Sequence, residues 1–251
     1  MAAAVAISQA RFGPGACRAA VLAPADPLLL AVAAPMAAVI GGPVLIAAPN
    51  CIPTSTRAEL ERIGATRLVA LGLDLPGTEK VGTSQDDSPT LSIVAAIFVR
   101  AAAGTVRAFA IGATEQSHRL AGPVGAAAAL RKFPVMLGPD AARQGAMEGE
   151  RRAAVTYLVG RDAIAAAAQV PGGFPLPAPT DDDVAARLAQ LLKADGVKAT
   201  SVGIAPPGAD PVLAAVLGSC GGPVLTAPAS PTALPGDPAA PSAQRVFTLP
   251  A

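Results

Sequence analysis

A five-residue phrase occurs twice in this chain of 251 residues. Gly41-Gly42-Pro43-Val44-Leu45 returns unchanged as Gly221-Gly222-Pro223-Val224-Leu225, each time after a run rich in Ala and Val. A degenerate third copy, Lys132-Phe133-Pro134-Val135-Met136-Leu137, lies between them. Because an internal repeat constrains the architecture more than any single motif, three copies of one strand-entry signal predict a β/α unit that is repeated three times.

The composition indicates an aliphatic core and no strong net charge. Apolar residues make up 52% of the chain and charged residues 15%, with six Phe, one Tyr and no Trp, and this apolar content argues against disorder. The formal net charge of +1 provides no long-range attraction for nucleic acid or for an anionic membrane. A polyanion would therefore have to be bound by a local pocket.

No charged residue occurs between Asp26 and Arg57, and an uncharged stretch of this length raises the question of a membrane span. Five prolines in the stretch would interrupt a single helix, so we predict a buried helix followed by a buried parallel strand instead. The first eight residues lack the basic and apolar segments of a secretory signal. We therefore expect a cytoplasmic chain or a mature fragment of a secreted protein.

Helical patterns alternate with near-continuous apolar strands, which predicts an α/β fold with a parallel sheet in each unit. Helices are expected at residues 2–10, 27–40, 57–63, 89–102, 117–130, 141–152, 181–194 and 211–219. Strands are expected at residues 18–23, 43–48, 68–71, 106–111, 134–137, 155–159, 200–204, 224–227 and 245–249. Thr56 and Glu59 are predicted to form a capping box, and Gly122-Pro123 is predicted to shorten or kink its helix.

Stretches rich in Pro and Gly divide the chain into three units. Linkers are predicted at residues 76–87 and 171–179. The units then cover residues 1–78, 79–173 and 174–251. Unit three is truncated, because prolines crowd the sequence after Ala227 where unit one has a further helix.

An ordered series of short motifs lies between Ala33 and Gly72. An Ala-rich helix with a Pro-x-Ala step precedes the Gly-Pro-Val-Leu-Ile strand, and Ile-Pro, Ala-Glu-Leu and Ile-Gly follow it. The residues are Pro35-Met36-Ala37, Gly42-Pro43-Val44-Leu45-Ile46, Ile52-Pro53, Ala58-Glu59-Leu60 and Ile63-Gly64. In this order the stretch resembles the cell wall binding repeat 2 family of Gram-positive bacteria. Units two and three match more loosely, but three tandem copies is the number typical of that family.

The resemblance implies a non-catalytic anchor. Three small Rossmann-like units would form a triangular pseudo-trimer at the cell surface and attach a secreted protein to an anionic wall polymer. The segments associated with the grooves between units would supply ligand-binding residues Pro43, Leu45, Ile46, Ile52, Pro53, Pro134, Met136, Pro223 and Leu225. The opening motif of the family, Arg-Leu/Ile-x-Gly-x-Asp-Arg-Tyr, is reduced to Gly and Asp within residues 81–87 and is absent from unit one.

Basic residues recur beside the ends of the predicted strands. They are Arg18, Arg67, Arg107, Lys132, Arg161, Lys198 and Arg245. Such residues could line grooves and pair with phosphates or carboxylates, and we include Arg18, Arg107 and Lys132 among the candidate ligand-binding residues. Ordinary solubilising charge at strand ends is the alternative interpretation.

The remaining motifs favour structural roles. His118, the only histidine, has no paired nucleophile in the sequence and is interpreted as a solvated or capping residue. Three consecutive aspartates at residues 181–183 are predicted to begin a helix rather than hold a metal, because adjacent side chains on a helix diverge. Asp26 and Asp210 each precede a proline and are predicted N-caps. The glycine pairs precede strands, which is the wrong polarity for a phosphate-binding loop.

The three cysteines are widely spaced and lie near no histidine, so they indicate neither a disulfide framework nor a zinc site. We interpret Cys17, Cys51 and Cys220 as small buried thiols.

The leading prediction is a non-catalytic module that binds anionic cell wall glycopolymer, without a cofactor or a metal and with neither nucleic acid nor a membrane as partner. The alternative is a structural subunit of a larger assembly that uses the repeat scaffold as a packing surface. An enzyme is the least supported class, because no nucleophile, base and metal set converges in the sequence.

Overall fold

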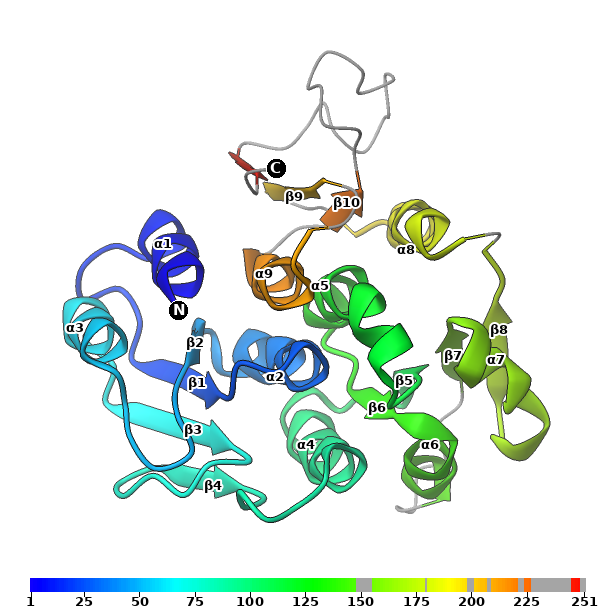
Figure 1. Ribbon diagram of the computed structural model, residues 1–251, viewed down its shortest axis with the longest axis horizontal. Coiled ribbons are helices and arrows are strands. Elements are labelled where there is room, and N and C mark those ends of the chain that lie inside the picture. The colour runs from blue at the N-terminus through cyan, green and yellow to red at the C-terminus, as the bar shows by residue number, and fades with distance from the viewer. Residues whose placement is uncertain are drawn as a thin grey trace.

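The computed structural model describes residues 1–147, 155–178, 180–197, 201–206, 209–220, 224–226 and 245–248. Within these residues the strands form three sheets, and every pairing between neighbouring strands is parallel (Figure 1). The predicted α/β class with parallel sheets is therefore confirmed. No described helix has both the length and the apolar character needed to cross a bilayer.

The first sheet has the order β2-β1-β3-β4. Its strands are β1 (Ala19–Ala23), β2 (Val44–Ile46), β3 (Arg67–Leu71) and β4 (Glu79–Val81). The helices of this unit are α1 (Ala2–Arg11), α2 (Pro27–Ile40) and α3 (Thr54–Ile63). Strand β1 is buried at every position, as expected for a parallel strand with both faces covered.

The second sheet repeats this order as β6-β5-β7-β8. Its strands are β5 (Arg107–Ile111), β6 (Val135–Leu137), β7 (Val155–Val159) and β8 (Gly173–Leu176). The α-helices are α4 (Ser88–Ala103), α5 (Ala121–Arg131), α6 (Gly138–Met147) and α7 (Arg161–Ala165). Two 3-10 helices, η1 (Glu115–Leu120) and η2 (Ala167–Gln169), complete the unit.

The third sheet has the order β10-β9-β11. Its strands are β9 (Ser201–Ala205), β10 (Val224–Thr226) and β11 (Arg245–Thr248), so the predicted closing strand is present. The helices are α8 (Asp181–Ala194), α9 (Pro211–Leu217) and the 3-10 helix η3 (Gly218–Cys220). The order of three strands around β1 thus recurs around β5 and β9, which matches the repeat in the sequence.

Two strands lie in stretches that were predicted to be linkers. β4 extends the first sheet by pairing with β3, and β8 extends the second sheet by pairing with β7. The linker prediction was wrong at these positions, because a short Pro- and Gly-containing segment can still pair along the open edge of a sheet. Each of these connections completes the sheet that precedes it.

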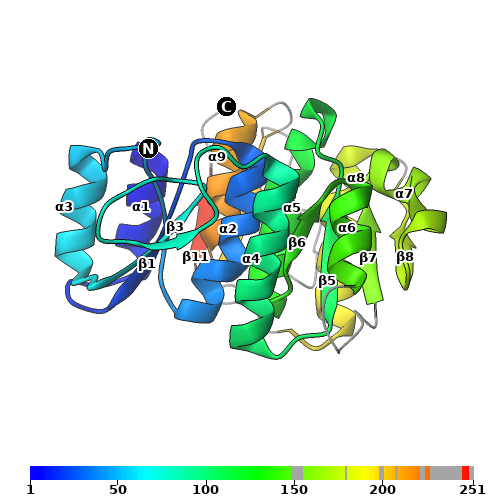
Figure 2. The same ribbon diagram turned by 90° about the horizontal axis from the view of Figure 1, so that it is seen from below.

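Helices α2, α5 and α9 contact one another at the centre of the molecule, with the three sheets around them (Figure 1). Every residue from Pro27 to Ala37 in α2 is buried, and so is every residue from Ala121 to Ala128 in α5. Figure 2 shows α2, α4 and α5 side by side with nearly parallel axes. The uncharged stretch after Asp26 is therefore a buried helix followed by a buried strand, as predicted.

Contacts between units form a closed ring. α4 packs against α2, α8 packs against α5, and α1 packs against α9. The first helix of each unit thus contacts the central helix of another unit, and the first unit contacts the third. This ring supports the triangular arrangement implied by the resemblance, which stays a prediction.

Glycines allow the central helices to approach closely. A Cβ atom added at Gly122 of α5 would lie 2.6 Å from the carbonyl oxygen of Ala214 in α9. One added at Gly125 would lie 3.0 Å from the Cα atom of Ala31 in α2. Because neither distance leaves room for a side chain, the helices pack backbone against backbone and gain dispersion contacts that larger residues would prevent.

The predicted N-caps at Asp26 and Asp210 are confirmed, and other helices have caps of their own. The side chains of Asp26 and Asp210 cap α2 and α9, and Thr180 forms a capping box with Asp183 at the start of α8. Gly41 ends α2 in the left-handed conformation with a φ of 70°. Lys132 occupies the same position after α5 with a φ of 53°, so the degenerate copy of the repeated phrase preserves the helix stop.

Other predicted features differ from the structure. α3 begins at Thr54, so Thr56 lies inside the helix and donates a hydrogen bond of 2.8 Å to the carbonyl oxygen of Ile46 instead of forming a capping box. The helix predicted from Ser117 is shortened at Gly122-Pro123: η1 precedes it, and α5 begins at Ala121. Cys17 is buried as predicted, but Cys51 is exposed. The end of the helix predicted at residues 141–152 lies outside the described residues.

A buried carboxylate joins α1 to α3. Glu59 is 1% exposed, and its two oxygens accept hydrogen bonds of 2.7 Å from Nε and Nη2 of Arg62. Ser8 of α1 donates a third hydrogen bond from its hydroxyl to Glu59. Burial alone would raise the pKa of Glu59, but the hydrogen bonds from Arg62 and Ser8 and the charge of Arg62 outweigh burial and lower it. Ionised Glu59 therefore stabilises the contact between the two helices.

The central helix contact can be tested with Gly122→Ala. Because the added methyl group would meet the backbone of Ala214, we expect the free energy of unfolding to fall by about 1–3 kcal/mol. The control is Gly13→Ala, where the nearest atom to the added Cβ is the Cβ of Ala16 at 4.0 Å. Urea unfolding should show a change of at most about 0.5 kcal/mol for this control. Equal effects of the two substitutions would contradict the close-packing argument.

The Glu59 contact predicts a specific acid sensitivity. Since folding lowers the pKa of Glu59 below 4.5, its contribution to stability is present above that value and is lost as pH falls through the lower folded pKa. Glu59→Gln should cost about 1.5–3 kcal/mol at neutral pH and should flatten the loss of stability between roughly pH 5 and 3. The measurement is urea unfolding across this pH range, with exposed Glu61→Gln as control. A pH profile like that of the wild type would refute this role of Glu59.

Candidate functional site

Several of the apolar residues predicted to bind ligand are buried, either within strands or directly before them. Pro43, Leu45, Ile46, Pro134 and Met136 are all buried. Buried side chains of this kind support the sheet and present no surface to a polymer. Their role in ligand binding stays a prediction.

The remaining apolar candidates lie elsewhere. Ile52 and Pro53 are half-buried and lie between β2 and α3, so they are the accessible part of the predicted segment. Leu225 lies in β10, and Pro223 lies outside the described residues.

The predicted basic residues are divided between the two edges of the sheets. Arg18 precedes β1, Arg107 begins β5 and Lys132 precedes β6, so these three lie at the amino ends of strands. Arg67 and Arg245 also begin strands, and Arg67 is already paired with Glu79 at 2.8 Å. Arg161 instead follows β7, at the carboxyl edge of the second sheet. Lys198 lies outside the described residues.

At the amino edge of the second sheet, Arg107 lines a shallow hollow of about 400 Å³. Its other lining residues include Thr105, Leu130, Arg131 and Phe133. Arg131 is less available to a ligand than Arg107, because its guanidinium is paired at 2.5 Å with Asp195, the residue that follows α8. Lys132 is exposed and lies in the chain between Arg131 and Phe133, two lining residues of this hollow. Ligand binding by Arg107 and Lys132 stays a prediction.

A larger cavity opens at the carboxyl edge of the second sheet. The chain leaves β5 toward β6 and returns on the other side of β5 as β7, so the topological switch point lies between β5 and β7. In open α/β sheets the crevice outside this point is the usual place for a ligand. A cavity of about 580 Å³ lies there, which we name the switch-point cavity. It is lined by Glu115, Gln116, Ser117, His118, Arg119, Leu120, Arg161, Asp162 and Pro211.

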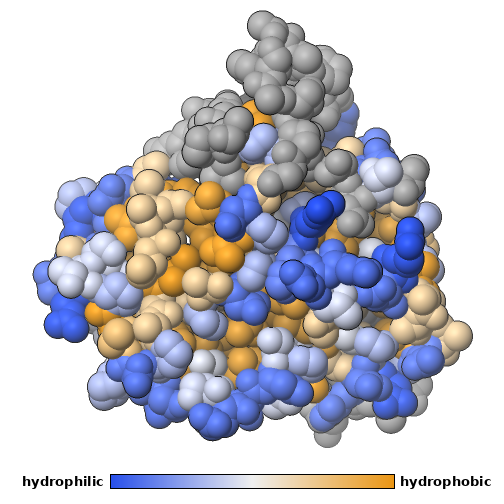
Figure 3. Space-filling model, viewed as in Figure 1, coloured by the Kyte–Doolittle hydropathy of each residue, from blue (hydrophilic) through white to orange (hydrophobic). Residues whose placement is uncertain are grey.

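Three elements build the switch-point cavity. η1 follows β5, α7 follows β7, and Pro211 comes from the start of α9 in unit three. The chain between β5 and the left-handed stop at Lys132 is three residues longer than the chain between β1 and the stop at Gly41. The 3-10 turn η1 occupies the place where α2 begins directly in unit one. Figure 3 shows hydrophilic residues gathered over η1 and α7.

The side of the cavity next to β5 depends on a glycine. Thr114 donates a hydrogen bond of 2.9 Å from Oγ1 to Oδ2 of Asp162, which joins the loop after β5 to the loop after β7. A Cβ atom added at Gly112 would lie 2.4 Å from Oγ of Ser117 and 3.0 Å from Oδ2 of Asp162. Gly112 therefore lets the polar side chains of both loops meet at the end of β5.

The cavity presents donors and acceptors together. Arg119 and Arg161 are exposed, and neither forms an ion pair with a described residue. Glu115 and Asp162 line the cavity with carboxylate oxygens, which are potential hydrogen-bond acceptors for a ligand. No hydrogen bond joins the Ser117 hydroxyl to His118 among the described contacts. The described residues also contain no group of three or more His, Cys, Asp or Glu that could hold a metal ion.

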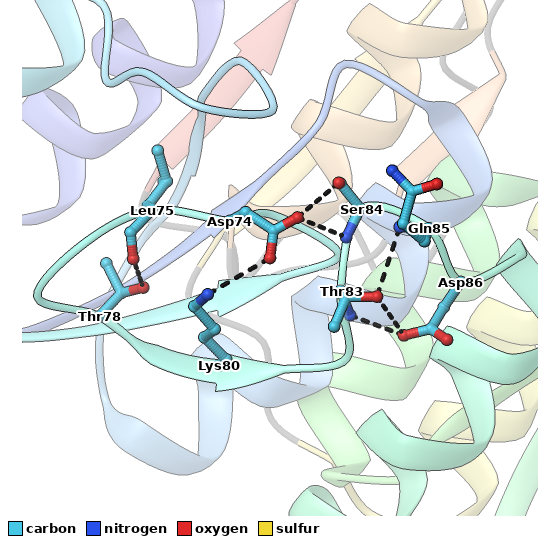
Figure 4. A network of polar contacts seen from close by, with 8 residues as sticks. All are labelled: Asp74, Leu75, Thr78, Lys80, Thr83, Ser84, Gln85 and Asp86. Atoms are coloured by element: carbon cyan, nitrogen blue, oxygen red, sulfur yellow. Dashed lines mark hydrogen bonds and ion pairs between the residues drawn. The ribbon is translucent and has the colours of Figure 1, made fainter.

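The equivalent position in unit one has a different environment (Figure 4). Gly72 and Asp74 follow β3 at the same spacing as Gly160 and Asp162 follow β7, and both glycines have a positive φ. Figure 4 shows Asp74 accepting hydrogen bonds from the backbone N–H and hydroxyl of Ser84 and from Nζ of Lys80 at 3.3 Å.

These hydrogen bonds from Ser84 and Lys80 hold the pKa of Asp74 below its usual value. A second turn, in which Asp86 accepts hydrogen bonds from Thr83, closes the same loop (Figure 4). The position of Arg161 is taken in unit one by Leu73, which is fully buried. The carboxylates at the carboxyl edge of the first sheet therefore form their hydrogen bonds within their own loop.

Sequence reasoning missed most of the switch-point cavity. Glu115, Arg119 and Asp162 were not candidates, and His118 and Arg161 were considered without being placed together. The one available signal was the extra length of unit two before its central helix, which is visible when the repeated phrases are aligned. That signal indicates an insertion, but it does not tell which side chains the insertion brings together.

The sequence matches no protein-family profile and no curated protein sequence. Solved structures do resemble the fold. Cwp6 from Clostridium difficile is similar over 98% of this chain and 43% of its own, with a TM-score of 0.68 and 17% identity. Cwp8 from the same organism is similar over 98% of this chain and 47% of its own, with a TM-score of 0.70 and 16% identity. This chain thus shares its fold with parts of two cell wall proteins and spans less than half the length of either.

Proposed function

We propose that this chain is a non-catalytic module that attaches to anionic glycopolymer of a bacterial cell wall. The observation that carries the proposal is the likeness of fold, which extends over 98% of the chain and concerns cell wall proteins in both cases. Since fold alone does not determine function, the proposal also depends on the candidate binding residues. Membership of the cell wall binding repeat 2 family belongs to the same proposal.

Two exposed cations, Arg18 and Lys132, and the half-buried Arg107 would bind the polymer. Arg18, Arg107 and Lys132 lie at the amino edges of their sheets, whereas Ile52 and Pro53, which follow β2, offer apolar contact at the carboxyl edge of the first sheet. With a net charge of only +1, attraction must come from such local groups rather than from the whole protein. Guanidinium groups suit phosphates and carboxylates because they donate paired hydrogen bonds.

The length of the similar proteins supports a role as one part of a larger chain. In both of them more than half of the protein lies outside the similar region. We propose that this module anchors such a protein at the cell surface.

A second candidate is a structural subunit of a larger assembly. Figure 3 shows apolar residues gathered over α1 and α9, and Ile97 on α4 is 54% exposed. Exposed aliphatic residues of this kind suit a protein partner better than a polyanion. This reading predicts binding that is insensitive to salt.

Co-sedimentation with purified Gram-positive cell walls tests the proposal. The wild-type chain should pellet with intact walls and should remain in solution after acid extraction of the anionic polymers. Raising the salt from 0.01 M to 0.15 M shortens the screening length from about 30 Å to about 8 Å and should weaken pelleting.

A variant carrying Arg18→Gln, Arg107→Gln and Lys132→Gly should lose most of its binding, at about 1 kcal/mol for each cation removed near an anionic surface. Glycine is chosen at Lys132 because it tolerates the left-handed conformation. The control is exposed Arg57→Gln on α3, which should pellet like the wild type. Equal pelleting with intact and extracted walls, or none with either, would refute attachment to the anionic polymer. Salt-insensitive self-association in gel filtration would then favour the assembly.

A further inference from the structure

The switch-point cavity has the size and lining of a site for a small ligand. Its volume of about 580 Å³ falls in the range of small-molecule sites, which measure roughly 300–1,000 Å³. It lies at the carboxyl edge of the sheet, away from the amino-edge cations invoked for polymer attachment. The lining comes from two units, because Pro211 of α9 closes one side of a cavity that is otherwise built by unit two.

The charged groups of the cavity determine which ligand it fits. Arg119 comes from η1 and Arg161 from the start of α7, so the two guanidinium groups approach the cavity from the loops after two neighbouring strands. Neither group is neutralised by a described carboxylate. α5 begins directly after η1, so the positive end of its dipole adjoins the lining residue Leu120. These features favour an anionic group.

The carboxylates of the cavity require a second kind of group on the ligand. Asp162 accepts one hydrogen bond from Thr114 and keeps further acceptor capacity, because a carboxylate has about four acceptor positions. Glu115 accepts no hydrogen bond from a described residue. Carboxylates that face a cavity with free acceptor capacity are matched by ligand hydroxyl groups. An anion alone would use the arginines and leave the free acceptor positions of these oxygens to water.

Unit one indicates that the site occurs once in the two units whose switch points are fully described. There, the aspartate equivalent to Asp162 is Asp74, and its oxygens are already occupied by Lys80 and Ser84. Buried Leu73 stands where Arg161 stands in unit two. Both units therefore have the same scaffold, but only unit two has an unpaired arginine and a carboxylate with free acceptor positions at this place.

We infer that the switch-point cavity binds a single anionic sugar unit, with its phosphate or carboxylate on Arg119 and Arg161 and its hydroxyl groups on Asp162 and Glu115. The inference deepens the proposed function and rests on it for the choice of a sugar. The cavity then recognises one unit or one end of the polymer, while the amino-edge cations provide attraction along its length.

Isothermal titration calorimetry of the whole chain tests this site with four probes: glucose 1-phosphate, glucuronate, inorganic phosphate and glucose. We expect glucose 1-phosphate or glucuronate to bind with a stoichiometry of one, inorganic phosphate to bind more weakly, and glucose to give no measurable heat. The comparison of the first two probes identifies the preferred anion. Inorganic phosphate binding as tightly as glucose 1-phosphate would overturn the role of the hydroxyl groups and hence the sugar.

Two substitutions test the residues. Arg161→Leu copies the residue found in unit one, and Arg119→Gln removes the second charge; each should weaken binding of the sugar anion by about ten-fold or more, since a hydrogen bond to a charged group is lost. Arg57→Gln, at an exposed position of α3, is the matched control and should leave the affinity unchanged. Unaltered affinity in both cavity variants, with thermal unfolding like that of the wild type, would overturn the assignment.

The wall-binding assay separates this inference from the proposed function. If the wild-type chain binds glucose 1-phosphate in the cavity but does not pellet with walls, the proposed function fails and the site stands. If the chain pellets with walls but none of the sugar anions binds, the site is overturned and the proposed function stands.

Discussion

The close approach of α2, α5 and α9 is the contact on which the rest of the structure depends. Gly122 and Gly125 remove the side chains that would hold these helices apart, and the backbones of Ala31 and Ala214 fill the space. A small parallel sheet with helices buries too little apolar surface to be stable alone, so each unit relies on the others for its core. The same contact sets the position of Pro211 against the loops of unit two, and it therefore also shapes the switch-point cavity.

Units one and two share one scaffold but differ in the loops at the carboxyl edges of their sheets. The register of β1 with β3 matches that of β5 with β7, and Gly72 and Gly160 follow at equivalent positions, but the loops after these glycines differ. In unit one the polar groups of this loop hydrogen-bond to one another, because Asp74 accepts hydrogen bonds from Ser84 and Lys80. In unit two the 3-10 turn η1 displaces the start of the helix and leaves guanidinium and carboxylate groups facing a cavity. Loops tolerate such changes because few buried contacts depend on them, and this is where repeated folds acquire function.

The fold could be predicted from the sequence to a large extent. Buried strands such as β1 and β7, and helix ends marked by Asp26, Thr180 or Gly64, follow from local rules that need no tertiary contact. The errors occurred where a distant partner decides the outcome. Thr56 had a capping pattern, but the carbonyl of Ile46 took its hydroxyl. The linker segments became β4 and β8 because the edges of β3 and β7 offered unpaired backbone groups.

The sequence by itself determined that one strand-entry signal occurs three times, that the fold is α/β with parallel sheets, and that the central helices are rich in aliphatic residues. Periodicity, capping residues and the repeated Gly-Pro-Val phrase carry this information locally. Only the tertiary structure decided which polar residues meet. Arg119 and Arg161 are far apart along the chain and come together because β5 and β7 are adjacent strands of one sheet. Pro211 joins them only because α9 packs against α5. Strand order and helix packing are properties of the whole fold, and no local pattern encodes the pairs of side chains they create.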